Sequence, residues 1–181
     1  MEKREFRKDL LHVLNNPGNR IPGFVWNRVE SLPQFMAART VLAYWAMPSE
    51  VPTEDFIGRW AGVKRIVLPL VTGDRLVLKE YCGKAGLVAG YKGVMEPSET
   101  AVTVAPDEID FAIIPGVAFD RGLHRMGRGK GFYDRLLPSV GCIKVGVGFD
   151  CQLFDEIPTD PWDVPLDLVA TPSELVGISK E

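Results

Sequence analysis

A chain of 181 residues with 46% hydrophobic and 25% charged residues has the composition of a soluble globular protein, and its length suits a single domain over residues 1–181. The net charge of −3 argues against a general nucleic-acid or membrane-surface binding protein. No apolar run approaches membrane-spanning length, and the charged N-terminus lacks the apolar core of a signal peptide. We expect a cytoplasmic monomer whose cysteines, which have no metal-binding or redox spacing, stay free thiols: Cys82, Cys142 and Cys151.

The first predicted element is an amphipathic helix over residues 2–14, which ends at the breaker sequence 15–18. Lys3 and Arg7 are four residues apart and project from one flank of the helix, where a solvated basic face is the ordinary interpretation. A second helix is predicted from Phe24 to about Leu32. The apolar stripe of the first helix is predicted to consist of Phe6, Leu10, Val13 and Leu14.

Apolar runs then alternate with helical and turn signals. Thr53 is the predicted cap of a helix that runs to about Ala61. Residues 83–100 are glycine-rich, and the pattern there predicts only irregular structure. The predicted strands cover residues 40–47, 65–71, 76–80 (joined to 65–71 as a hairpin), 111–114, 143–149 and, as the final strand, 167–170. This order predicts an α/β fold with a mostly parallel sheet covered by helices on both faces.

The most informative stretch is Arg125 to Arg135, in which Gly127, Gly129 and Gly131 alternate with cations before two aromatic residues and an acid. Alternating glycines let backbone N–H groups face an anion, and the helix predicted from Phe132 to Leu137 also favours phosphate at its start. The basic residues in this window favour a small anionic ligand over a polymer: Arg121, Arg125, Arg128, Lys130 and Arg135.

The spacing of this stretch is neither that of a Walker loop nor that of a Rossmann fingerprint, and a flexible glycine turn is the alternative. Asp134, directly behind the glycines, is well placed to hold a metal that bridges phosphate oxygens. Glu50 and residues 116–134 both follow buried strands, so we expect them to meet in one crevice. The residues by themselves predict an anion-binding α/β domain for a nucleotide.

Four separated blocks, spread over nearly the whole chain, stand out: Lys3-x-x-x-Arg7, Met47-x-x-Glu50-Val51-x-Thr53, Pro115 to Asp120 with Arg125 to Asp134, and Asp163-x-x-x-Asp167. Together these blocks resemble the 5-formyltetrahydrofolate cyclo-ligase family. Two places fit this pattern less well: Trp162 stands where the family often has histidine, and residues 93–97 match the middle segment only loosely. His12 and His124 are expected to be surface or packing residues.

The resemblance implies a three-layer Rossmann-like fold and an ATP- and Mg²⁺-dependent ring closure. It implies that Asp134 and Asp163 hold Mg²⁺, that Glu50 binds the pterin with Trp45 nearby, and that Lys3 and Arg7 reach the ATP phosphates. The residues implied to cradle the nucleotide and part of the folate are Arg125, Gly127, Arg128, Gly129, Lys130, Gly131, Phe132 and Tyr133, with catalytic roles for Lys130, Arg128 and Tyr133.

The reaction implied by the resemblance begins with phosphorylation of the formyl oxygen of 5-formyltetrahydrofolate and ends with closure to 5,10-methenyltetrahydrofolate. Such a reaction needs positioned cations rather than an activated Ser, Cys or His. Two other interpretations are a non-catalytic nucleotide- or RNA-binding relative and a metal-independent sugar-phosphate isomerase. Turnover without nucleotide would favour the isomerase.

Overall fold

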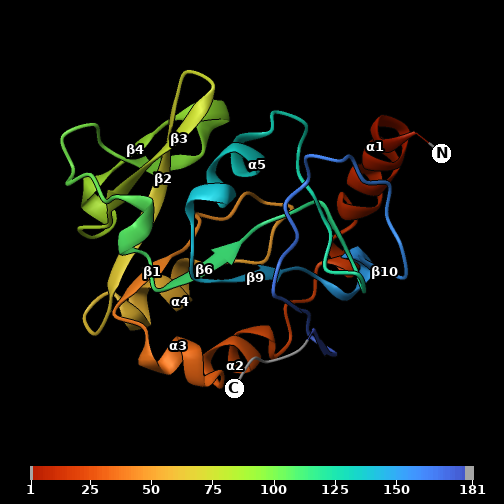
Figure 1. Ribbon diagram of the computed structural model, residues 1–181, viewed down its shortest axis with the longest axis horizontal. Helices are drawn as coiled ribbons and strands as arrows, with labels where there is room; N and C mark the ends of the chain where they lie inside the picture. Colours follow the sequence, from red (N-terminus) through yellow and green to blue (C-terminus); the bar gives the residue numbers. More distant parts are fainter. Residues whose placement is uncertain (1, 178–181) are drawn as a thin grey trace.

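The main sheet of this protein has seven strands in the order β12-β11-β9-β6-β1-β2-β3 (Figure 1). The computed structural model describes residues 2–177. The five inner strands pair in parallel, and the two edge strands pair antiparallel to their neighbours. The inner strands are β1 (Thr40–Leu42), β2 (Arg65–Thr72), β6 (Phe111–Ile114), β9 (Ile143–Val147) and β11 (Leu168–Ala170), and the edges are β3 (Arg75–Glu80) and β12 (Leu175–Val176). The predicted mostly parallel sheet is therefore confirmed.

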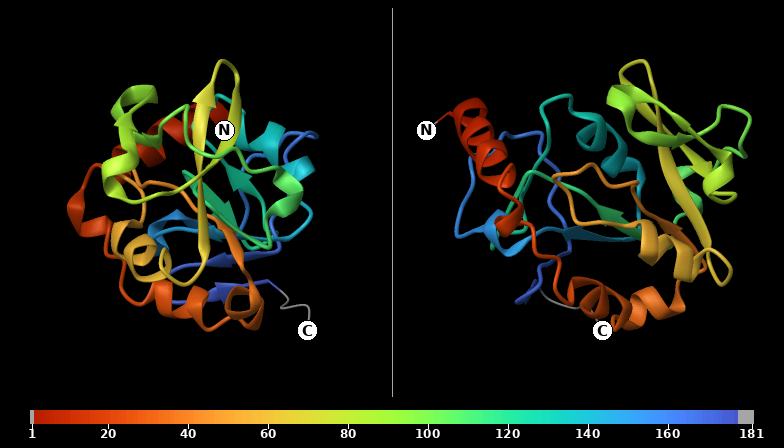
Figure 2. Two further views of the ribbon diagram at one scale, coloured as in Figure 1. Left: turned by 90° about the vertical axis from the view of Figure 1, so that its left-hand side faces the viewer. Right: turned by 180° about the vertical axis from the view of Figure 1, so that it is seen from behind.

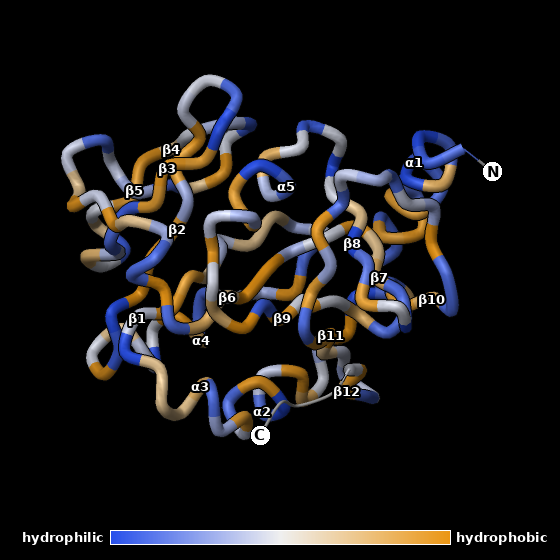
Figure 3. The backbone as a smooth tube through the Cα atoms, in the orientation of Figure 1, coloured by the Kyte–Doolittle hydropathy of each residue, from blue (hydrophilic) through white to orange (hydrophobic). Residues whose placement is uncertain are grey.

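Successive side chains of the inner strands enter two different cores, as expected for a sheet buried on both faces. On β6, Phe111 and Ile113 belong to one core, and Ala112 and Ile114 belong to the other. Figure 3 shows these central strands as predominantly hydrophobic. The first core also contains side chains of α1 (Lys3–Leu14), α2 (Val25–Glu30), α3 (Pro33–Ala37) and α4 (Glu54–Trp60), and the second contains those of α5 (Phe132–Leu136). Figure 1 shows α2 and α3 below the sheet and α5 above it, so the predicted three-layer arrangement is correct.

Two helix predictions need correction. On α1, Leu10 and Leu14 are buried, but Val13 is 41% exposed because the four-residue spacing of the buried positions leaves it at the border of the stripe. The helix predicted from Phe24 to Leu32 or beyond is two helices. Pro33 has no N–H with which to continue α2, and it instead starts α3. None of the described helices is long and apolar enough to cross a bilayer.

The first strand is shorter than predicted, because β1 ends at Leu42 rather than at residue 47. The hydroxyl of Thr53 donates a hydrogen bond to the Tyr44 carbonyl (2.6 Å) and accepts one from the Ala46 N–H (3.1 Å). The Tyr44 hydroxyl donates to the Val51 carbonyl at 2.9 Å. Thr53 does precede α4, but its side chain holds the folded-back segment 43–52 instead of capping the helix. We call residues 43–52 the floor segment.

Several short strands were not predicted. The region expected to be irregular contains β4 (Leu87–Ala89) and β5 (Met95–Pro97), which pair antiparallel. We call residues 83–97 the arm. Another small sheet joins β10 (Leu153–Phe154), β7 (Ala118–Asp120) and β8 (Arg125–Met126), and β12 rather than β11 is the last strand. Short 3-10 turns complete the structure at Pro17–Asn19, Lys84–Gly86, Tyr91–Gly93, Pro106–Glu108, Leu137–Ser139 and Asp150–Gln152.

The β2–β3 hairpin was predicted correctly, with Gly73 at a positive φ of 62° in its turn. The strand predicted over residues 143–149 ends two residues earlier, at Val147. Each of the three cysteines is a free thiol, as expected. Figures 1 and 2 place α1 beside the segment that follows β10, and Lys3 of α1 pairs with Asp160 and Asp163 of that segment.

Candidate functional site

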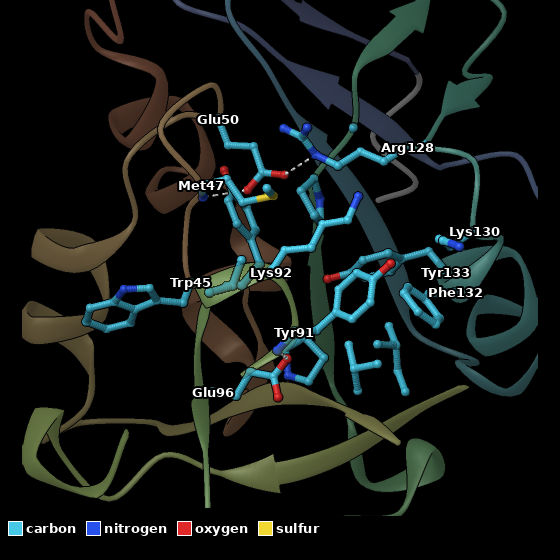
Figure 4. Close-up of a pocket in the computed structure, with 18 of the residues that line it drawn as sticks. Trp45, Met47, Glu50, Tyr91, Lys92, Glu96, Arg128, Lys130, Phe132 and Tyr133 are labelled. Carbon is cyan, nitrogen blue, oxygen red and sulfur yellow. Dashed lines mark hydrogen bonds and ion pairs between the residues drawn. The ribbon is translucent and has the colours of Figure 1, made fainter. Parts of the chain in front are cut away.

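A pocket lies beyond the carboxyl ends of β1 and β6, the edge at which parallel sheets bind ligands (Figure 4). The floor segment forms its deep end, the glycine loop forms one wall, and the arm forms the opposite wall. Glu50 and the loop following β6 therefore do meet in one crevice, as the sequence predicted. The side chains that line this pocket and are used below are Trp45, Glu50, Tyr91, Lys92, Glu96, Arg125, Arg128, Lys130, Phe132, Tyr133 and Asp134.

Glu50 is a buried carboxylate at the deep end of the pocket, with only 11% of its side chain exposed. Its Oε2 accepts a hydrogen bond from the Met47 N–H at 2.9 Å, and its Oε1 lies 3.6 Å from Nε of Arg128. Burial raises the pKa of Glu50, and the Met47 N–H and the Arg128 charge oppose this shift. Glu50 can therefore accept a pair of parallel N–H donors from a flat heterocycle.

Arg125 lies underneath the glycine loop rather than on it. Its side chain is buried, its Nε donates to the Pro115 carbonyl at the end of β6, and its guanidinium lies 4.8 Å above the Tyr133 ring. Burial lowers the pKa of Arg125, while the nearby Asp134 opposes that shift. A side chain at Gly127 would come within 2.9 Å of this guanidinium, which explains why glycine stands there. Arg125 supports the loop from below.

Helix α1 packs against the same loop through Arg7, whose Nε donates to the Gly127 carbonyl at 2.7 Å. A Cβ at Gly129 would lie 3.3 Å from Nη1 of Arg7, and Gly129 has φ of +101°. Arg7 and the glycine loop, predicted from distant parts of the sequence, are thus adjacent. Gly131 also has a positive φ, of 68°, immediately before α5. These conformations make the three-glycine spacing a structural requirement.

The remaining loop cations differ in how strongly they are already engaged. Arg128 donates to the Ser49 hydroxyl and lies beside Glu50. Arg135 does not face the pocket, because it donates to the carbonyls of Asp74 and Lys130 and so ties the loop to the β2–β3 hairpin. The Lys130 amine is exposed, and no described residue forms an ion pair with it. Lys130 is therefore available to bind an anion.

Tyr133 and Phe132, at the start of α5, supply the aromatic surface of the loop wall. Burial raises the pKa of the Tyr133 phenol far above its ordinary value, so the phenol stays protonated at neutral pH and can donate but not act as a base. The Phe132 ring meets the Tyr91 ring of the arm edge-on, with centroids 5.6 Å apart. Trp45 lies at the other side of the pocket, 6.3 Å from the Tyr81 ring.

The two carboxylates expected to hold magnesium have different surroundings. Asp134 is partly exposed, and its only charged neighbour among the described residues is Arg125, at 3.9 Å. Asp163 is occupied, because its Oδ2 accepts from Lys3 Nζ at 2.6 Å and from the Asp160 N–H at 2.9 Å. Lys3 also pairs with Asp160 at 2.7 Å. Within residues 2–177 there is no cluster of three or more acidic, histidine or cysteine side chains that could hold a metal.

The arm contributes five lining residues that the sequence did not predict: Tyr91, Lys92, Val94, Met95 and Glu96. Glu96 is 5% exposed, accepts from the Tyr91 N–H at 3.2 Å, and has a pKa that burial raises. Lys92 extends into the pocket from the tip of the arm, as Figure 4 shows. The Tyr91 ring contacts Phe132 of the loop wall. The only sequence signal for these residues was the loosely matching segment 93–97.

Comparison with known proteins shows the family to which this chain belongs. Residues 1–172 match the 5-formyltetrahydrofolate cyclo-ligase family. The chain belongs to this family. The 5-formyltetrahydrofolate cyclo-ligase of Escherichia coli K12 is 34% identical over 82% of this chain and 86% of its own. That of Mycolicibacterium smegmatis is 34% identical over 76% of this chain and 75% of its own.

Solved structures of the same group share the fold. The 5,10-methenyltetrahydrofolate synthetase of Aquifex aeolicus superposes with a TM-score of 0.88 at 36% identity, covering 100% of this chain and 94% of the other. The Mycoplasma pneumoniae 5,10-methenyltetrahydrofolate synthetase has a TM-score of 0.72 at 26% identity over 93% of this chain and 98% of the other. The α/β architecture of the cyclo-ligase family is therefore confirmed for this chain.

Of the two places at which this sequence fits the family pattern less well, Trp162 lies outside the pocket lining, whereas the segment 93–97 contributes Val94, Met95 and Glu96 to it. Trp162 is 70% exposed in the turn that Lys3 clamps between Asp160 and Asp163. Nδ1 of His124 lies 3.1 Å from both oxygens of the buried Asp120, so this histidine supports the small second sheet.

Proposed function

We propose that this protein, an enzyme of the cyclo-ligase family, uses ATP to convert 5-formyltetrahydrofolate to 5,10-methenyltetrahydrofolate, releasing ADP and phosphate. The observation that carries the proposal is that a buried carboxylate, Glu50, and the cationic glycine loop line the same pocket. A pterin offers Glu50 two N–H donors, and a triphosphate suits backbone N–H groups and cations. The pterin of the folate therefore suits Glu50, and the triphosphate of ATP suits the glycine loop.

The chemistry requires that an unreactive formamide become an electrophile. The formyl oxygen attacks the γ-phosphorus of ATP, and the bond to the leaving oxygen breaks so that ADP departs with its electron pair. The carbon now carries a phosphate leaving group on an iminium. The lone pair of the N10 amine then attacks this carbon, phosphate departs with the C–O electron pair, and N10 loses its proton. The product is the methenyl ring.

The residues of this chain would mainly position the reactants and balance charge, which is what phosphoryl transfer requires. Lys130, which no described carboxylate neutralises, would bind the transferring phosphate, with Arg7 and Lys3 on the α1 side. Arg128, next to Glu50, lies between the folate end and the phosphate end. The protonated Tyr133 phenol would donate a hydrogen bond at the same place.

The site also fits a magnesium ion held in the manner usual for nucleotide enzymes, by one or two carboxylates together with phosphate oxygens. Asp134 is suited to it because this carboxylate is partly exposed and has only a distant charged partner. Asp163 could join only after Lys3 releases it. When bound, the ion would neutralise charge on the phosphate oxygens.

A direct assay tests the proposed function. With ATP and Mg²⁺, purified protein is expected to convert 5-formyltetrahydrofolate to the methenyl product, seen as growth of near-ultraviolet absorbance. Asp134→Ala and Lys130→Ala are each expected to lower kcat about 100-fold while thermal unfolding stays close to wild type. Asp74→Ala and Lys8→Ala remove exposed charges elsewhere and serve as matched controls.

Wild-type turnover in both Asp134→Ala and Lys130→Ala would remove these residues from the mechanism. Binding of MgATP and folate without any product would instead indicate the non-catalytic relative considered from the sequence. We further propose that the protein acts in the cytoplasm as a monomer on small molecules, without a nucleic-acid partner. The net charge of −3 supports the last point.

A further inference from the structure

The tip of the arm has an unusual backbone conformation at Lys92. This residue has φ of 53° and ψ of 30°, in the left-handed region that is disfavoured for side chains with a Cβ. It stands between Gly90 and Gly93, so glycine would have been the expected residue at this position as well. A lysine in this disfavoured backbone conformation suggests that its side chain has a function.

The turn that carries Lys92 is fixed from two sides. The buried Glu96 accepts a hydrogen bond from the Tyr91 N–H, and a Cβ at Gly90 would lie only 2.3 Å from the Glu96 side chain, so Gly90 makes room for this contact. The Tyr91 ring meets the Phe132 ring of the opposite wall. Lys92 therefore projects from an anchored turn and is directed into the pocket (Figure 4).

The ammonium of Lys92 has no carboxylate partner among the described residues. Its Nζ lies 5.5 Å from the centroid of the Tyr91 ring. Neither of the two glutamates in the pocket is available as a partner for Lys92. Glu50 is engaged by the Met47 N–H and Arg128, and Glu96 is engaged by backbone N–H groups. Lys92 thus brings an uncompensated positive charge to the rim of the pocket.

We propose that Lys92 binds a carboxylate of the glutamyl tail of the folate, and this inference rests on the proposed function. If the pterin lies at Glu50 in the deep end, the tail must lead outward to the rim, where Lys92 is exposed. A phosphate is the less suitable partner, because the other cations that could bind it belong to the glycine loop and to α1, which contacts that loop through Arg7, and not to the arm. Lys92 then determines preference for folates over tail-less pterins.

Isothermal titration calorimetry with two probes tests this assignment: 5-formyltetrahydrofolate and 5-formyltetrahydropteroate, which lacks the glutamate. Lys92→Met and Lys92→Gly are expected to weaken folate binding about fivefold and to leave pteroate binding unchanged, as for loss of one exposed ion pair. The loss should shrink at high salt. Lys92→Gly should unfold at no lower temperature than wild type, because glycine suits this backbone.

Lys84→Met is the matched control, since Lys84 is an exposed lysine of the same arm that pairs with Glu54 outside the pocket, and it should bind both probes as wild type does. Equal weakening of both probes, no weakening of either, or weaker MgADP binding instead would each overturn the assignment. Wild-type protein that binds folate but does not convert it with ATP would contradict the proposed function alone. Absence of folate binding would contradict both.

Discussion

The two walls of the pocket are built in different ways. The glycine-loop wall is tied to its surroundings by charged side chains that reach backbone carbonyls: Arg125 to Pro115, Arg7 to Gly127 and Arg135 to Asp74. The tip of the arm, which faces the pocket, depends on one buried carboxylate, Glu96, and one aromatic contact, between Tyr91 and Phe132. The loop therefore has many supports and little freedom, whereas the arm has few.

This difference corresponds to what each wall has to recognise. A triphosphate must be surrounded by correctly aimed N–H groups, so the loop needs fixed backbone geometry and several glycines with positive φ. The arm only has to present a side chain at the rim, and a single clamped turn suffices. The comparison predicts that substitutions in the loop affect stability and nucleotide binding more than substitutions in the arm do.

The largest effect is expected for Arg125→Met, which removes the buried support of the loop. The variant leaves the Pro115 carbonyl and Asp134 without their partner, so the free energy of unfolding should fall by about 3 kcal/mol. Urea denaturation measures this change. Lys92→Met on the arm should cost less than about 0.5 kcal/mol. Similar losses for both variants would show that the two walls do not differ.

An intermediate effect is expected when a methyl group is added to matched glycines of the two walls. Gly129→Ala and Gly93→Ala each place alanine at positive φ, which should cost about 1–2 kcal/mol of stability. Only the first also displaces Arg7, whereas a Cβ at Gly93 meets nothing within 4 Å. Calorimetry with MgADP should therefore detect about a tenfold weakening in Gly129→Ala alone. Equal nucleotide affinities would argue against the Arg7 contact.

The smallest effect is expected for Glu96→Gln, which keeps an acceptor for the Tyr91 N–H and removes a buried charge. Burial raises the pKa of Glu96 in the folded protein, so the stability that its protonated form contributes is present below pH 4.5 and is lost as the pH rises through the raised pKa. The variant should gain stability relative to wild type between pH 4 and pH 7. If Glu96→Gln were instead less stable than wild type in this pH range, the N–H partners of Glu96 would stabilise its carboxylate form.

Prediction from the sequence succeeded where one chemical property decided the outcome. The β6 strand was predicted over its observed length because its four apolar residues lie between Asp110 and the Pro115-Gly116 turn signal. The glycine loop was found because its spacing is rare. Prediction failed where distant groups compete. The early end of β1 depends on the Thr53 hydroxyl, and the short strands of the arm have too few residues to show a period.

The surroundings of the candidate residues were harder to predict than the residues themselves. That Lys3 would be paired with Asp163 could not be foreseen, because the two lie 160 positions apart and each was assigned to a ligand by resemblance. The placement of Arg125 beneath the loop instead of on it also depends on tertiary structure, since only the folded chain brings the Pro115 carbonyl within its reach. The roles of all these residues stay predictions until the variants are measured.

The floor segment has a consequence for how such a pocket can change over time. Its shape is fixed by hydroxyl–backbone bonds from Thr53 and Tyr44, which are buried with the central sheet. The arm contributes few side chains to either core, with Leu87 buried in the first. Mutational drift at the outer wall can therefore adjust which substrates are accepted at little risk to folding, whereas the deep end is held to its present form by the same atoms that keep the domain together.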